Sequence, residues 1–441
     1  MSEIEDLEGK IRFYEDLIPP VYPDKFPEGF TLNPTGWALT PEVVNRPDIQ
    51  AQFEGSVKTI RPIGTMDVEF IDNRVIAAAK RGEIDLTEYY PCGMPCSGCF
   101  SEAAIVRDPT LLLTWQEMFE KAIDPARKIG LTSVKFLGWG ELLQNRDLFD
   151  ILDACEERGL EVSVFTRAQE LGSDHLTEMH YGHLGITTAR ELVQRLSQYS
   201  TLRILFGFHS FDEKRQNKIV KSTKDRTRDY SKNGLIFVDK GVSDYIGKRN
   251  RALQYLVEAG FNDPAKGQRL TLTATPTGLD QIDEMPDIYA WAARRNMPFI
   301  IAPTMESGEK AQGLMVRDTR VDPEHEKFIA LYTAVYQRAL KEGILSKEQI
   351  KEAGISAYAA TAACNQVANG LFVRINGLVK MCPGISEENS TYGNVHNQSI
   401  ATLWATSPNY ELGRKMNNWC TAKTNGMPVS SQEEIHRRLD L

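Results

Sequence analysis

Three cysteines lie close together in this chain of 441 residues: Cys92, Cys96 and Cys99, in the segment "YYPCGMPCSGCF". Their spacing is C-x3-C-x2-C. Three thiolates on one tight loop can hold three corners of a cubane iron–sulfur cluster and leave one iron without a protein ligand. A zinc site normally needs a fourth Cys or His nearby, but the next histidine, His175, is far along the chain. The residue types therefore favour an iron–sulfur cluster over zinc or a purely structural site.

The bulk composition argues against other roles for these cysteines. The chain has seven cysteines, and an odd number fits poorly with a disulfide framework. The acidic start "MSEIEDLEGK" lacks the features of a signal peptide, and no apolar run is long enough to span a membrane. We therefore expect a cytoplasmic protein, in which clustered cysteines more often bind metal or do chemistry than form disulfides. The net charge of -9 argues against broad nucleic-acid binding.

Short runs of β-forming residues alternate with helical patterns over most of the chain. The six runs span residues 84–90, 133–137, 161–165, 202–208, 270–275 and 298–303. Thr114 and Glu117 form a capping-box pattern, and Cys155 lies on the apolar face of a later predicted helix, where it is expected to be a core residue. This alternation predicts an α/β fold with a parallel sheet, open or curled into a partial barrel. The cysteine loop then follows the first strand, at the end where such folds place their active sites.

The composition divides the chain into three predicted parts. Residues 1–80 form a Pro-rich N-terminal extension of irregular structure, with six prolines between Pro19 and Pro41. Residues 81–312 form the barrel. Residues 313–441 form a smaller, loop-rich domain that includes a long helical pattern at 324–342 and three more cysteines.

A second motif, Gly138-Trp139-Gly140-Glu141, follows the second predicted strand. Glycines let backbone carbonyls approach a ligand closely, and a carboxylate can face an ammonium group. On its own, the G-x-G-E pattern equally fits a simple turn from strand to helix. Its position beside the cysteine loop, at the ends of neighbouring strands, favours a ligand site.

Taken together, these motifs resemble those of the radical S-adenosylmethionine (SAM) superfamily. The resemblance implies a partial (β/α)6 TIM-like barrel in which Cys92, Cys96 and Cys99 hold a [4Fe-4S] cluster. It further implies that SAM binds the open iron and is reductively cleaved to a 5′-deoxyadenosyl radical, which removes a hydrogen atom from a substrate. There is one departure from the pattern: the aromatic residue that often precedes the third cysteine is absent at Gly98, and Phe100 follows instead.

The resemblance also implies the residues that contact SAM. They lie beside the third cysteine and after the second, third and fourth strands: Phe100, Gly138, Trp139, Gly140, Glu141, Thr166 and Ser210. Three histidines, His175, His180 and His183, lie in a segment predicted to be a loop. They could form a separate metal site, but loop or surface histidines are the more common interpretation.

A second cysteine group lies near the other end of the chain. Cys364, Gly377 and Cys382 give C-x12-G-x4-C, and the intervening residues predict a β-hairpin that turns at Asn376-Gly377. This segment resembles the opening of SPASM and twitch domains, which carry auxiliary iron–sulfur clusters. Because this chain has fewer cysteines than those domains, the resemblance implies one auxiliary cluster, expected to be [4Fe-4S], on Cys364, Cys382, Cys420 and a ligand other than cysteine.

The expected function is that of a radical SAM enzyme acting on a C–H bond by dehydrogenation, epimerisation or cross-link formation. The substrate class stays open between a small natural-product or sugar-like molecule and a peptide. The resemblance implies a flavodoxin- or ferredoxin-type reductant as partner. The alternative is a non-catalytic iron–sulfur protein for electron transfer or cluster assembly, which would not need the ligand-shaped loop at Gly138–Glu141.

Overall fold

A computed structural model gives the structure of the chain. It describes eleven stretches, and every structural statement below concerns them alone: residues 3–32, 62–86, 108–138, 140–220, 244–276, 282–301, 323–356, 358–361, 366–384, 391–412 and 429–441. None of the helices in these stretches is long and apolar enough to cross a membrane.

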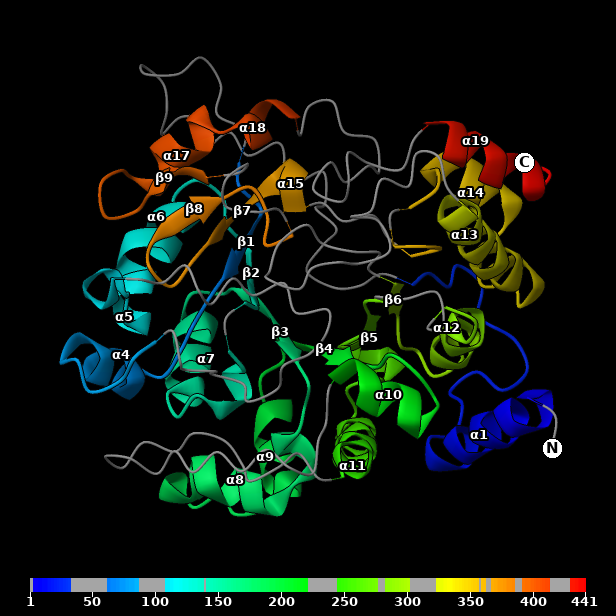
Figure 1. Cartoon of the computed structure of the whole chain (residues 1–441), viewed down its shortest axis with the longest axis horizontal. Coiled ribbons are helices and arrows are strands. Elements are labelled where there is room, and N and C mark those ends of the chain that lie inside the picture. Colours follow the sequence, from blue (N-terminus) through cyan, green and yellow to red (C-terminus); the bar gives the residue numbers. More distant parts are fainter. Residues whose placement is uncertain are drawn as a thin grey trace.

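One nine-stranded sheet organises the described residues, in the order β6-β5-β4-β3-β2-β1-β7-β8-β9 (Figure 1). Its first six strands are parallel and follow one another in sequence order. They are β1 (Thr65–Val68), β2 (Ser133–Phe136), β3 (Glu161–Thr166), β4 (Leu202–Gly207), β5 (Leu270–Ala274) and β6 (Phe299–Ile301). Among the described strands β6 and β9 are the two edges, so this sheet does not close on itself. The predicted α/β class, with β/α units in a partial barrel, is confirmed.

The first strand is not where the sequence predicted it. Residues 84–86 form a bend and turn, 87–90 lie outside the described residues, and the sheet starts at β1 instead. The short run "TMDV" was missed because its buried aspartate breaks the apolar pattern of a strand. Asp67 is buried because Lys135 on β2 pairs with it at 3.2 Å. The cysteine motif nevertheless still lies, in sequence, between the first two strands.

The prediction of an irregular N-terminal extension is wrong in part, although residues 18–32 form no helix or strand. Besides β1, the first 80 residues contain α1 (Glu3–Leu17) and α4 (Asn73–Lys80). On α1, Tyr14 packs against Phe208 and Trp291, with ring centroids 5.6 and 6.0 Å away. Helix α1 therefore packs against the residues after β4 and against α12 (Met285–Ala293), beside which it lies in Figure 1. The proposed limits of the three domains stay predictions.

Helices connect the strands largely as the sequence predicted. The capping box is present, since Glu117 N donates to Thr114 Oγ1 and Thr114 N donates to the Glu117 carboxylate. Cys155 is buried on α7, as expected for a core residue. The segment with three histidines is helical rather than a loop, because Ser173 caps its N-terminus. These connections contain α5 (Trp115–Met118), a π-helical turn (Phe119–Ile123), α6 (Asp124–Arg127), α7 (Leu148–Glu157), α8 (Asp174–Tyr181), α9 (Ala189–Ser197), α10 (Glu213–Val220), α11 (Tyr245–Glu258) and α12 (Met285–Ala293).

The C-terminal part extends the same sheet. Strand β7 (Gly370–Val373) pairs in parallel with β1, and β8 (Leu378–Lys380) and β9 (Thr391–Asn394) continue it in antiparallel fashion. The predicted hairpin is confirmed: its turn includes Gly377, whose φ of +77° favours glycine. The long helical pattern is also confirmed, as α13. The C-terminal helices are α13 (Pro323–Lys341), α14 (Lys347–Ala353), α15 (Gln366–Asn369), α17 (Ile400–Thr406), α18 (Pro408–Leu412) and α19 (Val429–Arg438).

Candidate functional site

The part of the candidate site that the structure describes lies at the carboxyl ends of the parallel strands. Register aligns these ends, because Val68 of β1 pairs with Phe136 of β2 on one side and with Val373 of β7 on the other. Of the predicted site residues, Gly138, Gly140, Glu141, Thr166, Ser210 and Cys382 are described. Those outside the described residues stay predictions: Cys92, Cys96, Cys99, Phe100, Trp139, Cys364 and Cys420.

Glu141 is held at the junction of β2 and β3. Both glycines before it have positive φ, +117° at Gly138 and +119° at Gly140, which side chains other than glycine rarely adopt. The Glu141 carboxylate is buried and accepts hydrogen bonds from Arg167 N at 2.9 Å and Leu143 N at 3.3 Å. The loop after β2 is therefore shaped by glycines and fixed by a carboxylate that reaches across to the end of β3.

A second buried carboxylate, Glu170, changes the charge state of Glu141. Burial and the negative charge of Glu170 together raise the pKa of Glu141 to about 8. Glu170 itself accepts a hydrogen bond from Gln144 Nε2 at 2.8 Å. An incoming cation would favour the ionised form of Glu141, so the pair is suited to a positively charged ligand group.

Thr166 belongs to the same cluster as Glu141. Its hydroxyl donates to the Glu141 carboxylate and accepts a hydrogen bond from Ala168 N at 2.7 Å. The structure thus brings together two residues that the sequence predicted for one site, from the ends of two neighbouring strands.

Ser210 belongs to a different polar cluster. Its Oγ donates to Glu284 at 2.7 Å and accepts from Asp212 N at 2.9 Å. Its carbonyl oxygen accepts a hydrogen bond from the buried Arg249 at 3.0 Å. Neither Arg249 nor Glu284 was predicted, because Arg249 on α11 and Glu284 at the N-cap of α12 are distant in sequence from Ser210.

The surroundings of His209 disfavour its protonated form. Burial, together with the nearby guanidinium groups of Arg167 and Arg249, holds the pKa of His209 well below its usual value. The Arg167 side chain contacts the His209 ring and also lies over Gly207, where a Cβ would come within 2.6 Å of it. His209 therefore lacks the charge needed for a general acid at neutral pH.

Glu69, at the end of β1, was not among the predicted site residues. It is buried and accepts hydrogen bonds from Ile375 N at 3.0 Å and Arg374 Nε at 3.3 Å. A Cβ on Gly138 would come within 2.4 Å of the Glu69 side chain. The sequence analysis missed Glu69 because it placed the first strand elsewhere; the acidic residue directly after "TMDV" would have been the signal.

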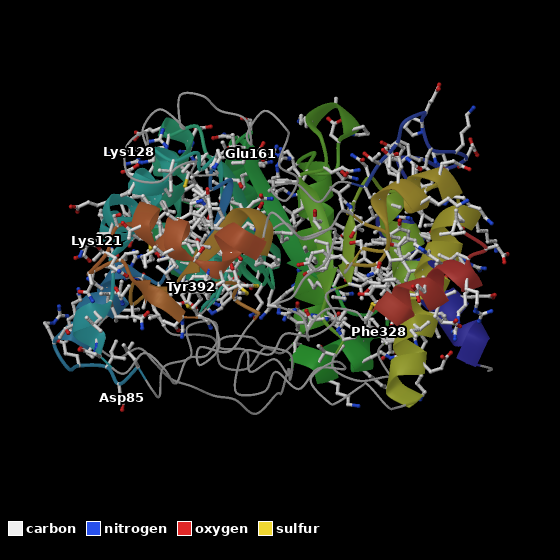
Figure 2. The ribbon with its side chains drawn as sticks, turned by 90° about the horizontal axis from the view of Figure 1, so that it is seen from above. Asp85, Lys121, Lys128, Glu161, Phe328 and Tyr392 are labelled. Atoms are coloured by element: carbon white, nitrogen blue, oxygen red, sulfur yellow. The ribbon has the colours of Figure 1, made fainter. Side chains whose placement is uncertain are left out.

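Cys382 lies just after β8, in the C-terminal hairpin region. The thiol is buried, and Gly384 N donates a hydrogen bond to its Sγ at 3.3 Å. Tyr392 on β9 is labelled in Figure 2. Burial, together with the nearby Cys382, raises the pKa of the Tyr392 hydroxyl. Such N–H···S bonds to a loop sulfur suit a cluster ligand, since hydrogen bonds to the sulfurs tune iron–sulfur clusters.

The described histidines do not assemble into a metal site. Burial lowers the pKa of His180 to about 4, and His183 Nδ1 accepts a hydrogen bond from Arg146 Nε at 3.2 Å. Within the described stretches, no group of three or more His, Cys, Asp or Glu side chains is placed to hold a metal ion.

No family model and no curated protein matches the chain. Among solved structures, it is similar to SuiB from Streptococcus suis bound to S-adenosylmethionine, with a TM-score of 0.43, 17% identity, and coverage of 80% of this chain and 68% of that chain. It is also similar to native anSMEcpe with bound AdoMet and the Cp18Cys peptide, with a TM-score of 0.48, 12% identity, and coverage of 86% and 97%. For BtrN in complex with AdoMet and 2-DOIA, the TM-score is 0.30 at 12% identity, with coverage of 85% and 96%. These identities and TM-scores are too low to establish a family, so the function is argued below from the residues.

Proposed function

We propose that this chain is a radical SAM enzyme. The observation that carries the proposal is the loop after β2, in which two glycines with positive φ lead into the buried carboxylate of Glu141. A C-x3-C-x2-C motif lies in the preceding connection of the chain, between β1 and β2. Loops after neighbouring parallel strands meet at one edge of a sheet, which is where α/β folds bind their ligands.

The described residues fit the methionine part of SAM. Gly138 and Gly140 turn the loop through positive φ angles, and Glu141 offers a carboxylate to the ammonium group. Thr166 holds that carboxylate in place. An iron–sulfur cluster on Cys92, Cys96 and Cys99 would supply the electron that cleaves SAM to a 5′-deoxyadenosyl radical, and a flavodoxin- or ferredoxin-type protein would supply electrons to the cluster.

The proposal includes one auxiliary cluster, on Cys364, Cys382 and Cys420. It is supported by the hairpin β7–β8 and by the N–H···S bond from Gly384 to Cys382. Such a cluster would accept an electron from a substrate radical or help to bind the substrate. The proposed substrate is a small natural-product or sugar-like molecule or a peptide, the classes that the motif combination predicts.

Anaerobic reconstitution with iron and sulfide, followed by SAM and dithionite, tests the proposal. We expect 5′-deoxyadenosine to form, and its formation to be abolished by Cys92→Ala, Cys96→Ala or Cys99→Ala. Cys155→Ala is the matched control, since Cys155 is buried on α7 and belongs to neither cysteine motif. Failure of the wild-type protein to form 5′-deoxyadenosine, or equal activity in all the variants, would contradict the proposal and favour the non-catalytic alternative.

Iron analysis tests the auxiliary cluster separately. A reconstituted wild-type protein is expected to hold about eight irons, as two [4Fe-4S] clusters require. Cys382→Ala should lower the iron content and leave the cluster of the first motif in place. An iron content that fits a single cluster in the wild-type protein would overturn this part of the proposal.

A further inference from the structure

The C-terminal hairpin joins the barrel through buried charges at β1. Strand β7 pairs in parallel with β1, so the residues that follow the two strands lie side by side. There Glu69 and Arg374 form an ion pair whose side chains are only 2% and 1% exposed. Separating a buried ion pair of this kind costs free energy, because each charge would then lie in the interior without compensation.

The hydrogen bonds of Glu69 fix the start of the hairpin turn. One carboxylate oxygen, Oε2, accepts from both Arg374 Nε and Ile375 N. These residues lead directly into the turn at Gly377, and β8 then leads to Cys382. The position of the Glu69 carboxylate is thereby tied to the path of the chain toward Cys382.

The same side chain packs on the loop after β2. A Cβ built on Gly138 would lie 2.4 Å from Glu69 Cγ and 2.7 Å from Oε1, far closer than real carbon atoms approach. Only a glycine fits at position 138, because the Glu69 side chain fills the space that a Cβ would occupy. A shift of the Gly138 backbone would press on Glu69 directly.

We propose that Glu69 is a positioning residue that couples the loop after β2 to the hairpin β7–β8. This inference rests on the proposed function, in which the loop binds the methionine part of SAM. A ligand that fixes the Gly138 backbone also fixes Glu69, and through it Arg374, Ile375 and the hairpin. Coupling of this kind is reciprocal, so a change at the hairpin alters the affinity of the loop for SAM.

A second polar link between the same parts of the chain offers a matched control. His396, which follows β9, contacts Lys121 Nζ through Nδ1 at 3.3 Å and Leu111 O through Nε2 at 2.9 Å. It thus joins the C-terminal part to the barrel, as Glu69 does. It has no part in the contact with Gly138, so the coupling proposed here does not run through it.

Hydrogen exchange of the reconstituted protein measures the coupling directly. Exchange of residues 370–384 is followed with and without SAM, at a concentration that saturates each variant. In the wild-type protein we expect SAM to slow this exchange by about tenfold, within the range of measured couplings. In Glu69→Gln the slowing should fall below about twofold, and in His396→Gln it should be retained. A merely structural role for Glu69 would change exchange equally with and without SAM.

The outcomes separate this inference from the proposed function. If wild-type protein does not bind SAM, the proposed function fails. If SAM binds but leaves exchange of residues 370–384 unchanged, or if Glu69→Gln keeps the full response, the coupling through Glu69 is wrong. If Glu69→Gln does not fold, the double variant Glu69→Gln with Arg374→Gln takes its place in the same comparison. The double variant removes both buried charges together.

Discussion

Two buried carboxylates at the same edge of the sheet are held in opposite ways. Glu69 is paired with Arg374, a buried cation of the chain itself. Glu141 accepts hydrogen bonds from two backbone N–H groups and the Thr166 hydroxyl, and it faces a second carboxylate, Glu170. The charge of Glu69 is thus balanced within the fold. The ionised form of Glu141 would instead be stabilised by a cation that a ligand brings.

This difference separates stability from binding. A buried charge whose partner is removed is strongly destabilising. A carboxyl group that is protonated at neutral pH carries no charge to lose, and it can exchange its proton for a cationic ligand. We therefore expect changes at Glu69 to act first on folding, and changes at Glu141 to act first on SAM binding.

The largest effect is expected from Glu69→Gln. The substitution breaks the buried ion pair of Glu69 with Arg374, so the free energy of unfolding should fall by about 3–5 kcal/mol. Replacing both residues, as Glu69→Gln with Arg374→Met, should recover much of that loss, since no charge is then left alone in the interior. Chemical denaturation of the three proteins measures both effects. Equal stability of wild-type and Glu69→Gln proteins would show that the ion pair is dispensable.

Glu141→Gln should have the reverse profile. An amide has nearly the same shape as the protonated carboxyl group that it replaces, so we expect the free energy of unfolding to match that of the wild-type protein within about 1 kcal/mol at pH 5. At pH 7 the variant should be the more stable protein, because an amide needs no proton to fold. Loss of the carboxylate should weaken SAM binding by roughly tenfold to a hundredfold, the value of a charge-assisted hydrogen bond. Calorimetric titration under anaerobic conditions measures the affinity. Unchanged affinity would remove Glu141 from the proposed site.

The sequence predicted the repeating part of the fold because that part depends on local patterns. The strands from β2 to β6 are short apolar runs with helices between them, and their positions agree with the structure within a few residues. Strand β1 was missed because Asp67 lies inside the sheet, where it pairs with Lys135, a residue far along the chain. A pattern read along the sequence contains no record of such a pairing.

The candidate site shows the same limit. Glu141 and Thr166 were predicted because each follows a strand, and the structure brings them into contact. The role of Glu170 required the three-dimensional structure, since only burial beside Glu141 makes it important. Ser210 was chosen by its position after a strand, but its hydroxyl is bound to Glu284, a residue of another segment. Side-chain partners distant in sequence decided each of these cases.

The pH dependence of the two regions should differ as well. The pKa of Glu141 in the folded state is raised to about 8, so the folded protein holds a proton there that the unfolded chain loses near pH 4.5. Stability from this group is therefore greatest at low pH and declines as the pH rises from about 4.5 to about 8, by roughly 2–4 kcal/mol. Glu141→Gln should remove that decline. Denaturation midpoints at pH 5, 6, 7 and 8 test it, and an identical decline in both proteins would assign it to another group.

Ligand binding should show the matching effect. Because the ammonium group of SAM favours ionised Glu141, binding should release a proton, and the affinity should rise by up to about tenfold per pH unit between pH 6 and 7.5. Glu170→Gln removes the negative charge that helps to raise the pKa of Glu141. The SAM affinity of this variant should therefore vary less with pH over this range. Titration in two buffers of different ionisation enthalpy counts the protons released. A count of zero for the wild-type protein would contradict the exchange of proton for ligand.

The smallest effect is expected from Thr166→Val, which keeps the shape of the side chain and removes its hydroxyl. The hydroxyl donates to Glu141 and lowers the pKa of that carboxyl group against the larger opposing effects of burial and Glu170. Without it, the pKa of Glu141 should rise further, so the increase of SAM affinity with pH should move to higher pH. The cost in stability should be about 2 kcal/mol, because the hydrogen bonds to Glu141 and from Ala168 N are both lost. Because Thr166 does not contact Glu69 in the way that Gly138 does, the SAM-dependent protection of residues 370–384 should persist in this variant at saturating SAM. Loss of that protection would mean that the two carboxylates belong to one coupled network rather than to two separable regions.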